Sequence, residues 1–185
     1  MASNDERGFS IIEVVVSVSL LAVGVSAVAQ LSVLSARAGT SAQAADTAQY
    51  AAREKLEQLR ALTFVSDDGA VTVTDVSSDL SVTPSAAAGG PGLAGGSGDT
   101  LLSNVAGFCD FLDGDGRWLS GGTRPPAGAV WVRRWSMQPL PGLADTILLQ
   151  VVVLPARLVG DPRAVAVARS NNGAWLFDLR ARTAR

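Results

Sequence analysis

An apolar stretch near the N-terminus is the feature that most constrains this chain. Residues 9–29 read FSIIEVVVSVSLLAVGVSAVA, which is about the length that a helix needs to cross the hydrocarbon core of a bilayer. The stretch carries one charge, Glu13. A carboxylate at that depth is unfavourable without a partner and marks a functional site by default. No Arg or Lys occurs between Phe9 and Ser35, so we look for the partner elsewhere, for instance in the amine that a cut before Phe9 would create.

The residues at the start of this stretch resemble a known processing motif. Gly8 and Phe9, with Glu13 four residues later and an unbroken apolar run behind it, resemble the prepilin N-terminal motif of type IV pilins and type II secretion pseudopilins. The resemblance implies cleavage between Gly8 and Phe9 by a membrane aspartic peptidase, followed by N-methylation of Phe9. It also implies that Glu13 pairs with the Phe9 amine of a neighbouring subunit inside an apolar filament core.

Two other interpretations of the N-terminus stay open. Ala27-Val28-Ala29 is an acceptable cleavage site for a secretory signal peptide ending at Ala29, and an uncleaved anchor would also contain an apolar run. Neither alternative accounts for Glu13 within the run or for the Gly-Phe junction. The leader, residues 1–8, carries Asp5 and Glu6 against a single Arg7, so the positive-inside signal for orientation is weak.

The helix is predicted to continue beyond the apolar stretch, through residues 30–62. No proline interrupts residues 9–62, and at 1.5 Å per residue such a helix is about 80 Å long, more than a bilayer requires. Arg53 and Glu57 have the i,i+4 spacing of an ion pair. Apolar residues recur at helical spacing as on one face of an amphipathic helix: Leu31, Leu34, Ala38, Ala45, Ala48, Ala52, Leu56 and Leu59. The part at residues 52–62 is predicted to lie on the globular domain through Leu56, Leu59 and Leu62.

A β-rich globular domain is predicted over residues 63–185. Strands are expected around Val71 and Val73, at residues 130–137, where Trp131, Arg133 and Trp135 would share one face of a half-buried strand, and at residues 147–154, in the centre of a sheet. Asn172-Gly173 predicts a hairpin between strands at residues 165–169 and 174–180. The fold class is therefore α+β, a long helix laid across an antiparallel sheet of about four strands, which resembles the pilin fold.

Two stretches of this domain have a distinctive composition. Residues 84–98, PSAAAGGPGLAGGSG, have the Gly, Ser and Pro content of a flexible loop with little capacity to form a core, so we expect a surface excursion or a loop that faces a partner. Residues 130–154 resemble minor pilins of the PilV group and the I-type pseudopilins of type II secretion.

Three carboxylates lie within six residues of the segment DFLDGDGRW: Asp110, Asp113 and Asp115. Calcium takes several oxygen ligands from flexible loops, which makes these residues a candidate site. Arg117 occupies the third acidic position of an EF-hand pattern and no Glu follows at the required spacing. A polar turn between strands explains the same residues, and we prefer that interpretation.

The remaining candidates have more ordinary explanations. Cys109 has no neighbouring His or Lys to activate it and is predicted to be a buried, inert thiol. The tryptophans are expected to fill the core instead of forming a ligand platform: Trp118, Trp131, Trp135 and Trp175. The arginines could form a basic patch for DNA or for an acidic pilin, but solvated edge residues are the preferred interpretation: Arg133, Arg134, Arg180, Arg182 and Arg185.

Composition argues against an enzyme and against a nucleic-acid-binding protein. The chain has no histidine, a single cysteine and a formal net charge of −2, so it lacks the commonest general base and any basic footprint. The resemblance of the N-terminal motif to type IV pilins then implies a minor pilin or pseudopilin without a required cofactor, anchored in the bacterial inner membrane with its leader in the cytoplasm and its domain in the periplasm. Its expected partners are other pilin subunits, prepilin peptidase and an inner-membrane assembly platform.

Overall fold

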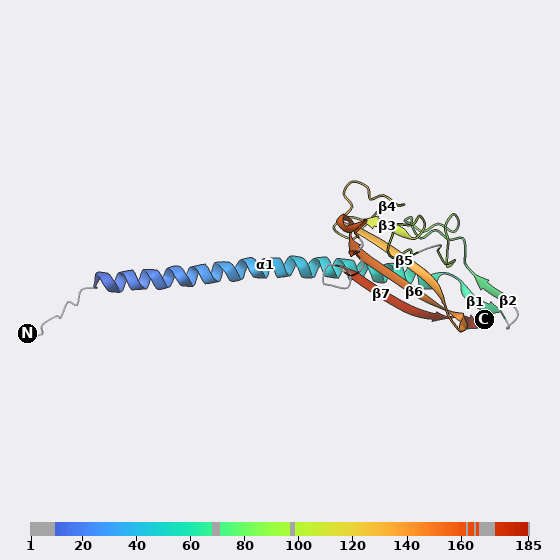
Figure 1. Cartoon of the computed structure of the whole chain (residues 1–185), viewed down its shortest axis with the longest axis horizontal. Helices are drawn as coiled ribbons and strands as arrows, with labels where there is room; N and C mark the ends of the chain where they lie inside the picture. Colours follow the sequence, from blue (N-terminus) through green and yellow to red (C-terminus); the bar gives the residue numbers. More distant parts are fainter. Residues whose placement is uncertain are drawn as a thin grey trace, which may run out of the picture. The chain divides into compact units, whose positions relative to one another are not determined.

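The computed structural model describes residues 10–67, 71–96, 99–161, 163–164, 166 and 173–184. The chain divides into two compact units, residues 1–40 and residues 41–185. Among the described residues, the regular elements with defined bounds are one long helix, eight strands and a short 3-10 helix, η1 (Ala156–Leu158) (Figure 1).

Helix α1 (Ile11–Ala61) is 51 residues long, so the predicted helix is confirmed over nearly its whole length. It begins where the Ser10 carbonyl accepts bonds from the N–H groups of Glu13 and Val14. It ends where the sequence changes from good helix formers to Thr63, Phe64 and Val65, which favour extended backbone. Strand β1 (Phe64–Asp67) follows almost at once.

The strands form two sheets. The smaller has the order β2-β1-β8, with β2 (Val71–Thr74) antiparallel and β8 (Thr183–Ala184) parallel to β1. The larger has five strands in the order β4-β3-β5-β6-β7, all antiparallel to their neighbours. Its strands are β3 (Cys109–Leu112), β4 (Trp118–Gly121), β5 (Trp131–Leu140), β6 (Leu143–Pro155) and β7 (Ala174–Ala181). The predicted α+β class, a long N-terminal helix with an antiparallel sheet, is confirmed.

The larger sheet is buried on both faces along most of β5. One face packs against the C-terminal part of α1 through Trp131, Trp135 and Met137. The other face contributes Val132 to a second apolar cluster with Cys109 and Phe111. The prediction of a half-buried strand here is therefore wrong, because chain far away in sequence covers the second face.

The glycine-rich segment helps to form the domain core. The backbone groups of Ala86 and Asp79 exchange two hydrogen bonds, of 2.8 and 3.0 Å. Leu93 is buried in the cluster that contains Trp135. The expectation of a surface loop with little capacity to form a core holds for residues 84–89, which are exposed. It fails at Leu93, which packs into the core and holds this part of the segment against the domain.

The other predicted strands have mixed outcomes. Val71 and Val73 lie in β2 and residues 147–154 lie in β6, an interior strand of the larger sheet. β7 pairs with β6. The strand predicted at residues 165–169 lies mostly outside the described residues, and Ala166, which is described, is helical.

Candidate assembly helix and its attachment to the sheet

The N-terminal half of α1 is exposed in the described part of the chain. Every residue from Ser10 to Gln43 is exposed, and large apolar side chains such as Leu20 and Leu21 are 69% and 66% exposed. The helix is long and apolar enough to cross a membrane by length and composition. Such a surface has to be covered by lipid or by other helices, because water contact with this much apolar area is unfavourable.

Several serines in this half bond to the helix backbone. Ser17 and Ser26, for example, donate to the carbonyls four residues earlier, Glu13 and Ala22, at 2.7 and 2.8 Å. The Glu13 carboxylate has no ion-pair partner among the residues that the structure describes. Glu13 is therefore a solitary charge on an apolar helix, as the sequence indicated.

The C-terminal half of α1 buries one face on the larger sheet. Ala48, Ala52 and Leu59 are fully buried, and Leu56 nearly so. They pack with Trp135 and with residues of β6 in one cluster, which Leu62 joins as a half-buried member. The predicted packing through Leu56, Leu59 and Leu62 is confirmed. The predicted pair of Arg53 with Glu57 is wrong, because Glu57 instead accepts a hydrogen bond from Arg60 at 2.6 Å.

A buried ion cluster lies within this interface. Lys55 Nζ lies 3.0 Å from an Asp110 carboxylate oxygen, and the Arg133 guanidinium binds both oxygens of the same carboxylate at 2.9 and 2.8 Å. Arg133 also donates to the Ala51 carbonyl and to Glu54, each at 2.9 Å. Lys55 donates to the Leu80 carbonyl and lies over the Trp135 ring. The cluster joins α1, β3 and β5 through Lys55, Asp110 and Arg133, which are almost entirely removed from water, and Glu54 lies at its exposed margin.

Burial changes the acid-base properties of Lys55. Desolvation lowers the pKa of its ammonium from 10.5 to about 8, against the opposing attraction of Asp110. One signal for this cluster is present in the sequence: Lys55 falls on the same helical stripe as Ala48, Ala52 and Leu59. A charge on an apolar stripe requires a buried partner, although the stripe does not say which residue that is.

The predicted exposure of Arg133 and Arg134 is wrong. Both side chains are buried, Arg133 in the ion cluster and Arg134 on the opposite face of β5. There Arg134 donates to Asn104 at 2.8 Å and to the carbonyls of Leu101 and Leu102 at 3.0 and 2.9 Å. Arg133 bonds to helix α1 on one face of the sheet, and Arg134 bonds to the segment at residues 101–104 on the other face. Neither arginine is therefore part of a basic surface patch.

The three carboxylates of the calcium candidate are not brought together. Asp110 belongs to the ion cluster, while Asp113 accepts bonds from the N–H groups of Asp115 and Arg117 at 2.9 and 2.8 Å. Among the described residues, no group of three acidic, cysteine or histidine side chains is arranged to hold a metal. The turn between β3 and β4 therefore accounts for Asp113 and Asp115, and calcium binding stays an untested prediction.

Two arginines near the C-terminus link separate elements of the domain, Arg180 to the end of α1 and Arg182 to strands β1 and β2. Arg180 donates to the carbonyls of Leu59 and Leu62, at 3.2 and 2.7 Å, where the last turn of a helix lacks internal partners. Arg182 donates to the carbonyls of Val65 and Val73. The interpretation of these two residues as solvated edge arginines is wrong. Arg185 lies outside the described residues.

The tryptophans and the cysteine largely follow prediction. Trp131 and Trp135 are buried in the core, and Trp118 and Trp175 are half-buried at its margins. The Cys109 thiol is buried beside the Gly122 carbonyl, at 2.9 Å, and burial raises its pKa from 9.0 to about 11. The prediction of an inert thiol is therefore supported, since the reactive form of cysteine is the thiolate.

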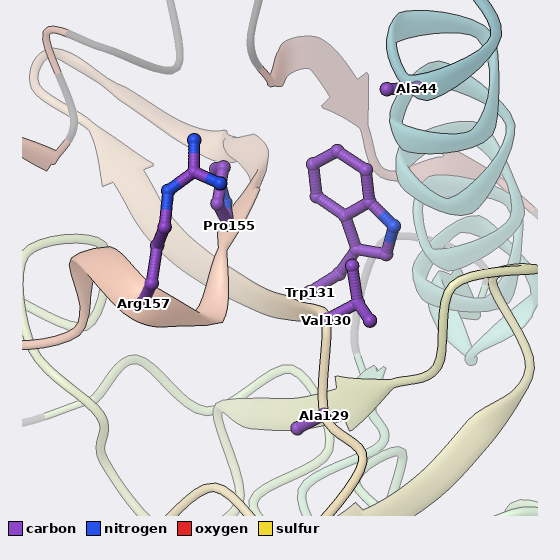
Figure 2. A pocket seen from close by; sticks show the side chains of 6 residues that line it. All are labelled: Ala44, Ala129, Val130, Trp131, Pro155 and Arg157. Atoms are coloured by element: carbon purple, nitrogen blue, oxygen red, sulfur yellow. The ribbon is translucent and has the colours of Figure 1, made fainter. Parts of the chain in front are cut away.

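A pocket of about 310 Å³ lies between η1 and the start of β5. Figure 2 shows Arg157 and Pro155 on one side and Trp131 on the other, with Ala44 of α1 at the margin. Apart from Arg157 its walls are mostly apolar, and its lining residues include no pair of groups suited to acid-base or nucleophilic chemistry.

Comparison with protein families gives one match. Residues 3–29 match the prokaryotic N-terminal methylation motif. The N-terminal segment is type IV pilin-like. No curated protein and no solved structure is significantly similar to the chain.

The pilin-like segment contains Gly8, Phe9 and Glu13, the three residues that carried the resemblance. Gly8 and Phe9 lie outside the described residues. Together the motif and the long apolar helix indicate membrane anchoring through the N-terminal segment. The subgroup within the pilins and pseudopilins is not identified by the match, which ends at residue 29.

Proposed function

We propose that this chain is a minor pilin or pseudopilin, a structural subunit of a type IV pilus or a type II secretion pseudopilus. In this proposal prepilin peptidase cleaves between Gly8 and Phe9, the Phe9 amine is methylated, and the globular domain lies in the periplasm before assembly. The observation that carries the proposal is the solitary Glu13 on an uncovered apolar helix, inside the methylation motif.

The proposed mechanism is charge pairing between subunits. A filament packs apolar helices side by side and leaves Glu13 in a medium of low dielectric, where an unpaired carboxylate is strongly disfavoured. The new Phe9 amine of a neighbouring subunit supplies the opposite charge. Pairing therefore favours one relative register of the two helices as they leave the lipid, because other registers leave both charges unpaired.

The experiment that tests this mechanism is a comparison of Glu13→Gln with Asp46→Asn. Both changes remove one negative charge from an exposed position on α1. We expect Glu13→Gln to insert in the membrane and to be cleaved normally, yet to enter filaments at least ten-fold less. Asp46→Asn should behave like the parent chain. Equal incorporation of the two variants would remove the pairing mechanism.

Replacement of Gly8 tests the processing step separately. A bulky residue at Gly8 should block the peptidase and leave the mass of the precursor. A mature chain that instead begins at Gln30, with or without the change at Gly8, would favour the alternative of a secreted protein whose signal peptide ends at Ala29.

A further inference from the structure

Strand β7 leaves one edge of the larger sheet open within the described part of the chain. It is the last strand in the order β4-β3-β5-β6-β7, and Figure 1 shows it along the outer margin of the sheet. The opposite edge strand, β4, has four residues, ends in Gly121 and pairs with a register shift. β7 has eight residues, AWLFDLRA, with no Pro, Gly or Lys. Short or irregular edges resist further pairing, whereas long regular ones invite it.

The register of β7 shows which backbone groups point to the open edge. Ala181 is opposite Thr146 on β6, and the Arg182 N–H donates to the Asp145 carbonyl at 2.7 Å. In an antiparallel pair such bonding residues alternate with residues whose backbone groups point away. The N–H and C=O groups of Phe177, Leu179 and Ala181 therefore point to the open edge.

The same residues present apolar side chains. Phe177 is 71% exposed and Leu179 is 56% exposed. They lie on one face of the strand, and Leu148 of β6, opposite Leu179, adds a half-buried leucine beside them. An open strand edge that is also flanked by exposed apolar side chains is suited to the addition of another strand, because backbone bonds and apolar burial are gained together.

The other face of β7 is fixed to α1. Asp178 accepts a bond from Arg60 at 2.8 Å, and Arg180 donates to the C-terminal carbonyls of α1. These contacts hold the strand in its extended form, so little conformational entropy is lost when a partner strand binds.

We propose that β7 pairs antiparallel with β7 of a second copy of this chain, with Leu179 opposite Leu179. The charge pattern of the strand is complementary to itself in this register, since Asp178 of each copy lies opposite Arg180 of the other. Phe177 then lies opposite Ala181, and the apolar side chains of both copies form one continuous strip. A register shifted by one residue on each copy would place Asp178 opposite Asp178, which is unfavourable.

The paired segment is short, so we expect it to form only between copies that are already anchored in the same membrane. Five residues from each copy, Phe177 to Ala181, form too small an interface for a stable dimer in dilute solution. Anchoring of both copies in one membrane raises their effective concentration toward the millimolar range. The inference requires membrane anchoring but neither cleavage at Gly8 nor pairing of Glu13.

Disulfide trapping in the full chain tests the register. Leu179→Cys would place two thiols on an opposed pair with Cα atoms about 5.5 Å apart, within disulfide range. Phe177→Cys is the matched control, because it is on the same face and more exposed, yet its two copies would be roughly 14 Å apart along the strands. Cys109 is buried and contributes no reactive thiol.

We expect mild oxidation of membranes containing full-length Leu179→Cys to give a disulfide-linked dimer at least five-fold faster than Phe177→Cys. Unchanged melting of both variants would show that neither exposed substitution alters the fold. Equal rates would indicate random collision, and absence of a dimer in Leu179→Cys would indicate that the edge is covered by lipid or by another protein. Either result overturns the proposal. Normal Gly8 processing with no β7 dimer would leave the proposed function intact.

Discussion

The two halves of α1 use the same secondary structure for different purposes. Residues 10–40 expose apolar side chains on every side, whereas residues 41–61 bury a single stripe on the sheet. The charged groups differ in the same way: Glu13 has no ion-pair partner among the described residues, while Lys55 lies in a cluster with Asp110 and Arg133. The half of α1 that contains Lys55 has its charge paired within the chain and stabilises the domain. The half that contains Glu13 depends on lipid or on other helices to cover it.

The largest expected effect on stability comes from removing the centre of the ion cluster. Asp110→Ala leaves Lys55 and Arg133 buried without their shared carboxylate, which should lower the free energy of unfolding by about 3–5 kcal/mol. Denaturant unfolding of a fragment of residues 38–185 measures this. Asp115→Asn, on the exposed turn that follows, should change stability by less than about 0.5 kcal/mol.

If Asp110→Ala and Asp115→Asn lowered the free energy of unfolding by similar amounts, the assignment of Asp110 as the shared partner of Lys55 and Arg133 would be contradicted. A calcium titration of the parent fragment and of both variants tests the hypothesis that these aspartates bind calcium. A calcium site would raise the melting temperature of the parent fragment.

Two leucine-to-alanine substitutions, one in each half of α1, test whether only the second half supports the fold. Leu59 is fully buried and Leu34 is 65% exposed. Leu59→Ala should cost about 2–4 kcal/mol in the unfolding of the domain, through lost burial and a cavity. Leu34→Ala, made in the full chain, should leave domain unfolding unchanged and affect only membrane or filament association. A stability loss from Leu34→Ala would show that the first half of α1 also supports the fold.

The fastening of the end of α1 gives a smaller effect. Arg180→Met removes the donor to the carbonyls of Leu59 and Leu62 while keeping most of the side chain's apolar body. We expect a loss of about 1–2 kcal/mol and faster hydrogen exchange in the last turn of the helix. Arg53→Met, on the exposed face, is the control that should leave exchange unchanged.

The smallest effect is a pH dependence specific to Lys55 and Cys109. Because the pKa of Lys55 is lowered to about 8 from 10.5, the folded chain releases this proton before the unfolded chain does, and stability rises with pH between those values. The pKa of Cys109 is raised to about 11 from 9.0, so its contribution falls above pH 9. The net rise is therefore confined to about pH 8–9 and amounts to about 1 kcal/mol.

Two variants separate these contributions. Cys109→Ala should extend the rise toward pH 10.5, and Lys55→Met should abolish it, as followed by denaturant unfolding across the range. A rise that persists in Lys55→Met would assign it to another group.

Two elements that depend on local sequence pattern were predicted correctly. The long helix followed from the absence of proline and from helical spacing around Leu56 and Leu59, and the interior strand β6 followed from its continuous apolar run. Gly8 and Phe9 lie within the matched methylation motif, and their cleavage and methylation stay predictions.

Most of the failures involve partners distant in sequence; the exception is Glu57, which bonds Arg60 three residues away instead of Arg53. Arg133 is buried because Asp110, Ala51 and Glu54 meet it, and nothing in its own neighbourhood indicates those residues. Likewise Asp110 sits in an acidic segment that suggests a cation, while its two cations come from α1 and β5. A pattern reports which side chains need partners, and only the tertiary fold supplies them.

The intact mass and N-terminal sequence of the mature chain, purified from membranes or filaments, test the central claim most directly. The account predicts a chain that begins with N-methylated Phe9, so that a free amine is available to the Glu13 of a neighbour. A mature chain that begins at Gln30, or an unprocessed chain within assembled filaments, would contradict it.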